Sequence, residues 1–174
     1  AVEKTFGDAA EGVLKLGENA AKSIGLSRTE FAQLATGFAS FAGTVAGEGG
    51  DVVATVQEMT TRAADFASVL NMDVSRAVRL FQTSLAGEAE SMRRFGIDVS
   101  AVTVEQYALA NGLASSKKEM TESVKVQARY GVIMAATESM AGDFADTSDD
   151  LANSQRILSA DIKNLKDNVG AGLL

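Results

Sequence analysis

Four aspartates in the last third of the chain are the residues whose type and spacing come closest to a chemical site. Asp143, Asp146, Asp149 and Asp150 are spaced so that three carboxylates can share one face of a helix. Converging oxygens at about 2.0–2.6 Å bind calcium or magnesium, usually in a turning loop. The spacing of an EF-hand is absent, and acidic residues at a helix start also stabilise it through the helix dipole. We therefore interpret these aspartates as helix-start charges and predict no metal site.

The residue types that most enzymes use for nucleophilic or acid–base chemistry are missing. The sequence contains no Cys and no His, which excludes disulfides, thiolate zinc sites, cysteine nucleophiles and the Ser-His-Asp arrangement. No pair of carboxylates is set apart as the acid and base of a glycoside hydrolase. We predict that the chain is not an enzyme, has no catalytic residues and uses no cofactor.

The charge balance argues against tight nucleic-acid binding. The chain carries 16 Lys and Arg against 23 Asp and Glu, a net charge of −7. The basic pairs Arg93-Arg94 and Lys117-Lys118 are scattered rather than gathered into a stripe with aromatic residues between them. We interpret them as solvated charges with local ion pairs to Glu88 and Glu90, and expect contact with DNA to be transient.

The elements that position these residues are predicted to be helices. The sequence has no Pro, is rich in Ala and is 46% hydrophobic with only 6% aromatic residues. A capping box of Ser27 and Glu30 predicts a helix that starts near Arg28, and Asp51 is the expected N-cap of the next. Gly87 is the expected residue after a helix end.

The predicted fold class is all-α. We expect an Ala-rich, bundle-like helical region over residues 1–118 with a compact middle segment, followed by long helices over residues 119–174. Residues 97–104 alternate apolar and polar side chains, so at most one short β-hairpin is expected there. The chain starts at Ala1 without Met and ends within a pattern, so we expect it to be a segment of a longer protein.

A heptad repeat distinguishes the last third of the chain. Two sets of mostly apolar residues recur every seven positions for roughly six repeats, as the a and d positions of a coiled coil do. Gln155 is a polar exception that could fix the register, and we expect a bend or break between Gly142 and Asp150. The residues predicted to form the self-association seam are Leu151, Leu158, Ile162, Leu165 and Val169.

The segment from Phe31 to Gly47 leaves a second possibility open. It is almost uncharged and contains small residues, yet it falls short of the roughly 20 apolar residues of a membrane span. We expect a buried or oligomer-facing helix there. The alternative is a membrane-active module, forming a channel or acting in ejection, that contacts the host membrane.

Three blocks of the sequence resemble one family. GEAESMRRFGI at residues 87–97, KVQARYGVIM at 125–134 and GDFADTSDDLANSQRIL at 142–158 are similar, in that order, to tail tape measure proteins of siphophages, especially those that infect actinobacteria. The departures are Ser154-Gln155 in place of Gln-Gln and Ser91-Met92 in place of a common Pro. The similarity covers roughly residues 20–166.

The resemblance implies a structural virion protein located in the tail lumen or at the tail tip. Such a protein governs tail length and assembly and leaves the tube during genome ejection. From the resemblance and the heptad seam together, we expect further copies of the chain as partners, as a trimer or alternatively a hexamer. Tail-tube proteins and hub proteins of the tail tip or baseplate are the other expected partners.

Overall fold

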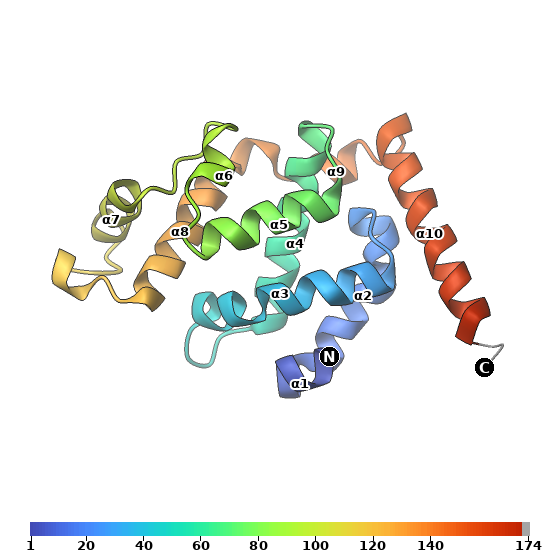
Figure 1. The fold of residues 1–174 in the computed structure, drawn as a ribbon, viewed down its shortest axis with the longest axis horizontal. Coiled ribbons are helices and arrows are strands. Elements are labelled where there is room, and N and C mark those ends of the chain that lie inside the picture. The colour runs from blue at the N-terminus through green and yellow to red at the C-terminus, as the bar shows by residue number, and fades with distance from the viewer. Residues whose placement is uncertain (172–174) are drawn as a thin grey trace.

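The computed structural model describes residues 1–171, and within that range it is helical and contains no strand (Figure 1). The predicted all-α class is therefore confirmed. The α-helices are α1 (Val2–Phe6), α2 (Ala10–Ile24), α3 (Arg28–Ala46), α4 (Val52–Val69), α5 (Val74–Leu85), α6 (Glu90–Arg93), α7 (Ala101–Ala110), α8 (Glu122–Ala136), α9 (Asp143–Asp146) and α10 (Leu151–Ala171). Short 3₁₀ turns lie at Gly7–Ala9, Lys117–Glu119 and Glu138–Met140.

The predicted caps start the long helices. The Ser27 hydroxyl accepts a hydrogen bond from the backbone N–H of Glu30, and the Glu30 carboxylate accepts one from the N–H of Ser27 at 3.0 Å. Asp51 accepts a hydrogen bond from the N–H of Ala54 at 2.9 Å and so caps α4. Each cap satisfies N–H groups that the first helical turn leaves without a partner. These local predictions are confirmed.

The hydrophobic core lies around α4, which packs against α2, α3 and α5. Phe38 of α3 and Phe66 of α4 are fully buried. Phe66 meets the rings of Phe81 and Phe95 edge-on, at centroid distances of 5.6 and 5.3 Å, which is a favoured aromatic geometry. α8 packs against α3, α5 and α7 and therefore belongs to the same core.

The strand-like pattern at residues 97–104 does not form a hairpin. Its first half is an irregular segment, and α7 begins at Ala101. The Asp98 carboxylate explains the change, because it accepts hydrogen bonds from the N–H of Ser100 at 2.9 Å and from the hydroxyl of Thr103 at 2.7 Å. These short-range bonds favour a helix start over the extended conformation that alternation alone suggests.

The heptad repeat is not carried by one continuous helix. α8 ends at Ala136, and Gly142 adopts a φ of +86°, which L side chains rarely adopt. The earlier heptad positions Thr137 and Phe144 are buried in the core. The bend or break predicted between Gly142 and Asp150 is present, and within the described range the repeat continues on one helix only from Leu151. The coiled coil itself stays a prediction.

The division of the chain at residue 118 stays a prediction. The last residues of the predicted C-terminal region, 172–174, lie outside the described range. The contacts of α8 with α3 and α5 cross that boundary.

Candidate functional site

The candidate site is the outer face of α10, which lies at one end of the molecule beside α2 (Figure 1). A helix of 3.6 residues per turn separates residues by about 100° each, so positions spaced seven apart stay on one side. The row that faces the core combines two such pairs, Asn153 with Ala160 and Ile157 with Asn164. The residues of the predicted seam lie about 120–180° around the helix from Asn153. The seam therefore faces away from the protein body.

The start of α10 is held by a polar cluster at the junction of α4 and α5. The side-chain amide of Asn153, only 2% exposed, donates hydrogen bonds to the hydroxyls of Ser68 and Thr147, both at 2.8 Å. Arg156 donates to the side-chain oxygen of Asn153 and to the backbone oxygen of Met72. Because these groups are polar and satisfied, they fix the rotation of α10 about its axis.

The second half of α10 is held by the first turn of α3. Asn164 accepts a hydrogen bond from the N–H of Arg28 at 2.8 Å, and Lys163 forms an ion pair with Glu30. Burial alone would raise the pKa of Glu30, but hydrogen bonds from Lys163 and Ser27 outweigh it and hold the pKa below its usual value. The inner face of α10 is thus anchored at both ends.

The seam itself forms an exposed apolar ridge. Its five side chains are 45–76% exposed, and they follow one another at spacings of seven, four, three and four residues. Isolated exposed apolar residues are ordinary, whereas a row of them along one helix is typical of interaction surfaces. The structure brings together all the residues predicted for the seam: Leu151, Leu158, Ile162, Leu165 and Val169.

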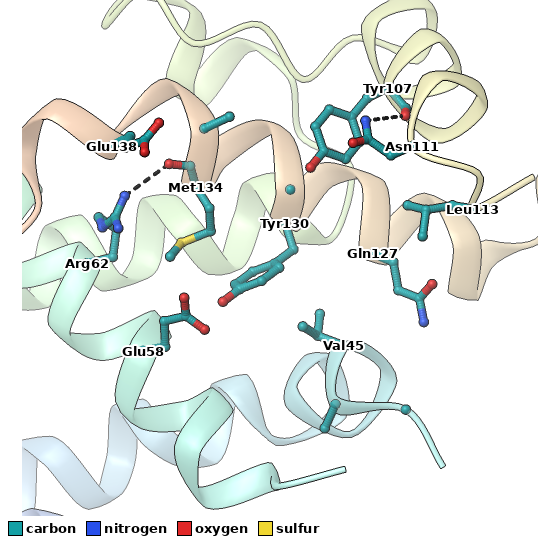
Figure 2. A pocket seen from close by; sticks show the side chains of 14 residues that line it. Val45, Glu58, Arg62, Tyr107, Asn111, Leu113, Gln127, Tyr130, Met134 and Glu138 are labelled. Carbon is teal, nitrogen blue, oxygen red and sulfur yellow. Dashed lines mark hydrogen bonds between the residues drawn. The ribbon is translucent and has the colours of Figure 1, made fainter. Parts of the chain in front are cut away.

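Sequence reasoning missed a cleft that has a volume of about 720 Å³ and lies between α3, α4, α7 and α8 (Figure 2). The Tyr130 ring points from α8 toward Glu58 of α4, and within residues 1–171 its buried hydroxyl has no hydrogen-bond partner. Burial, followed by the nearby Glu58 carboxylate, raises the pKa of Tyr130 far above its usual value. Tyr130 is therefore a neutral phenol at physiological pH and cannot serve there as a base.

Other ionisable groups beside the cleft hold the fold together. Arg62 donates hydrogen bonds to the backbone oxygen of Met134 at 3.0 Å and to the hydroxyl of Thr137 at 3.3 Å, and so closes the end of α8.

Gly131 lets the Tyr107 ring lie against α8, since a Cβ there would be 2.4 Å from that ring. No signal in the sequence pairs Gly131 with Tyr107, because 24 positions on two different helices separate them.

The aspartates that opened the sequence analysis lie around the short helix α9. Asp143 and Asp146 are in α9, and Asp149 and Asp150 are exposed just before α10. Within residues 1–171, no three carboxylates are placed so as to hold a metal ion. Of the scattered cations, Arg93 pairs with Glu90 at 2.6 Å, as the sequence predicted.

The segment proposed as membrane-active is α3, and its apolar side faces the core. Phe31, Ala35, Phe38 and Ala42 are all buried. Among the helices of residues 1–171, none combines the length and apolar character that a bilayer-spanning segment needs.

No family model, curated protein or solved structure matches the chain.

Proposed function

We propose that this chain is a segment of a tail tape measure protein, a structural and non-enzymatic component of a phage tail. The proposal is supported by three sequence blocks in the family's order and by the helical, Pro-free composition. In this role the protein lies in the tail lumen or at the tail tip, governs tail length and assembly, and is released during genome ejection. Tail-tube and hub proteins of the tail tip or baseplate are its proposed partners.

The observation that carries the proposal is the exposed ridge of α10. Its spacing is that of a coiled-coil seam, with Leu at d and mostly β-branched residues at a. A seam of this kind is self-complementary, so the occupant we propose is a further copy of the same chain. We propose three copies, with six as the alternative. β-branched a residues with Leu at d favour two strands in a free coiled coil, so a complex of two chains is the result that would count against this number.

The ridge is short, and its strength should depend on how many copies are held together. α10 has 21 residues and about three heptads, which is little contact area for a stable complex between free chains. Copies confined in one tail have a high effective concentration, which converts a weak contact into a persistent one. The net charge of −7 also disfavours lasting contact with DNA phosphates that pass through the same tube.

The proposal is tested in the virus that encodes the protein. Leu158→Asp combined with Ile162→Asp places charges on the ridge without touching the core. Val102→Asp is the matched control, because Val102 is 65% exposed on α7, at the other end of the molecule (Figure 1). Electron microscopy is expected to show missing or irregularly long tails for the ridge variant and normal tails for the control. Normal tails in both, or absence of the chain from purified tails, would contradict the proposal.

A further inference from the structure

We infer that neighbouring copies associate through α10 in parallel and in register, with Asp161 of one copy paired to Lys166 of the next. This inference rests on the proposed self-association and adds its orientation. The evidence is the position of charged side chains beside the ridge, the space around α10 and the placement of Gln155.

The flanks of the ridge are open. In the heptad that places Leu158 at d and Ile162 at a, Asp161 occupies g and Lys166 occupies e. Both side chains are exposed, and neither forms an ion pair within residues 1–171. The remaining e and g residues between 152 and 168 are uncharged. Ala152, Ser159 and Asn168 are exposed, and Ser154 is partly exposed.

The charges distinguish a parallel from an antiparallel pair. In a parallel coiled coil, a g residue lies beside the e residue that is five positions further along the neighbouring helix. Asp161 and Lys166 have that spacing, so each interface gains an attractive ion pair. In an antiparallel pair, g faces g and e faces e. Asp161 would then meet another Asp161 or an uncharged side chain, and Lys166 would likewise find no acidic partner.

Gln155 favours the in-register arrangement. It is exposed at an a position, between Leu151 and Leu158. In register, each Gln155 meets the same residue of its neighbour, and the two amides can hydrogen-bond to each other. A shift by one heptad would place Gln155 against apolar residues and leave its amide without a partner, which is unfavourable.

The bodies of the two copies leave room for this contact. The face of α10 that is anchored to α3, to α4 and to the turn after α4 through Asn164, Asn153 and Arg156 lies opposite the ridge. When two ridges meet, both bodies therefore lie on the outside of the helix pair. The same geometry holds around an axis with more than two copies.

Cysteine cross-linking of the full chain tests the orientation, because the chain has no Cys of its own. Leu151→Cys, Leu158→Cys and Leu165→Cys are prepared as separate variants and oxidised under mild conditions, with Val102→Cys as the exposed control. A parallel, in-register contact brings each d residue next to the same residue of the neighbouring chain, at a distance that a disulfide can span. All three variants are expected to form dimers at least tenfold faster than Val102→Cys.

The charge pair is tested on the Leu158→Cys variant. Asp161→Lys alone places two lysines together and should slow the cross-linking at least fivefold at low salt. Asp161→Lys with Lys166→Asp reverses both charges and should restore the rate. A rate that is unchanged by the single reversal, or not restored by the double one, would overturn the assigned ion pair.

Two further outcomes separate this inference from the proposed function. Cross-linking that occurs in a mixture of Leu151→Cys and Val169→Cys, but not in Leu151→Cys alone, would show an antiparallel contact. That result overturns the inference and leaves self-association intact. Cross-linking no faster than Val102→Cys for every ridge variant would count against self-association itself.

Discussion

The carboxylate of Asp65 on α4 accepts a hydrogen bond from the backbone N–H of Phe144 at 3.0 Å, although 79 positions separate the two residues. Its second oxygen accepts one from the N–H of Gly142 at 2.9 Å. Asp65 is 2% exposed, so this buried side chain supplies the partners that the start of α9 lacks. α8 and α10 are thereby kept as separate helices, and the free ridge begins only after this junction.

Replacing Asp65 by Asn should destabilise the fold. Asn has one acceptor oxygen, so one of the two N–H groups loses its partner, at a cost of about 1–3 kcal/mol in the free energy of unfolding. Asp73→Asn is the matched control, because Asp73 caps α5 with a single bond to Arg76, which Asn can also form. Urea unfolding at neutral pH measures both, and equal costs would contradict the role given to Asp65.

Glu30 should make the docking of α10 sensitive to acid. Its pKa is lowered in the folded state, so its contribution is present above about pH 4.5 and is lost as the pH falls through the lowered pKa. Glu30→Gln keeps the capping box but removes the ion pair with Lys163, at a cost of about 0.5–1 kcal/mol at pH 7.

The pH dependence of that cost provides the check. The difference in free energy of unfolding between the wild type and Glu30→Gln should shrink below pH 4.5. In the wild type, the protection of α10 amides against hydrogen exchange, taken relative to the intrinsic rate at each pH, should fall over the same range. Glu11→Gln on the exposed side of α2 controls for the loss of one negative charge. A difference that is constant with pH would be inconsistent with the Glu30–Lys163 pair.

Tyr130→Phe should leave the protein as stable as before or stabilise it by up to about 1 kcal/mol. The hydroxyl is buried without a partner, so its removal relieves a desolvation cost. Because the folded state retains the phenolic proton, stability should fall as the pH rises above about 10, and Tyr130→Phe should reduce that fall. Ultraviolet titration in a Tyr107→Phe background follows Tyr130 alone, since the chain has two tyrosines. Ionisation of Tyr130 near pH 10 in the folded protein would refute this account.

Gly131→Ala should cost about 1–3 kcal/mol, since the added Cβ collides with the ring of Tyr107. In a Tyr107→Ala background the collision is absent. The same change should then be neutral or slightly stabilising, because Ala is the better helix former. A double-mutant cycle measures this change of sign. An equal cost in both backgrounds would show that α7 and α8 do not depend on this contact.

The sequence predicts the features that depend on nearby residues. Ser27 and Glu30 are three positions apart, so their capping box can be recognised without knowing the fold. The ridge can be recognised for the same reason, because one helix carries it. The capping box is confirmed, whereas the role of the ridge in self-association stays a prediction.

The features that depend on distant residues could not be predicted. Phe144 and Leu151 occupy equivalent heptad positions, yet Phe144 is buried and Leu151 is 76% exposed. The segment around Phe144 is held in the core by contacts with other helices, among them the hydrogen bonds that Asp65 accepts from Gly142 and Phe144. The contact of Gly131 with Tyr107 and the cleft beside it likewise arise only when α7 and α8 pack together.

The central claim is that the exposed ridge of α10 joins copies of this chain, and the mass of the purified protein over a range of concentrations tests it most directly. Sedimentation equilibrium of the wild type is expected to give a mass that rises with concentration toward a multiple of 18.1 kDa. The Leu158→Asp, Ile162→Asp variant is expected to remain at 18.1 kDa, while Val102→Asp behaves as the wild type. A wild-type chain that stays at 18.1 kDa up to millimolar concentration, or a ridge variant that associates equally well, would contradict the account.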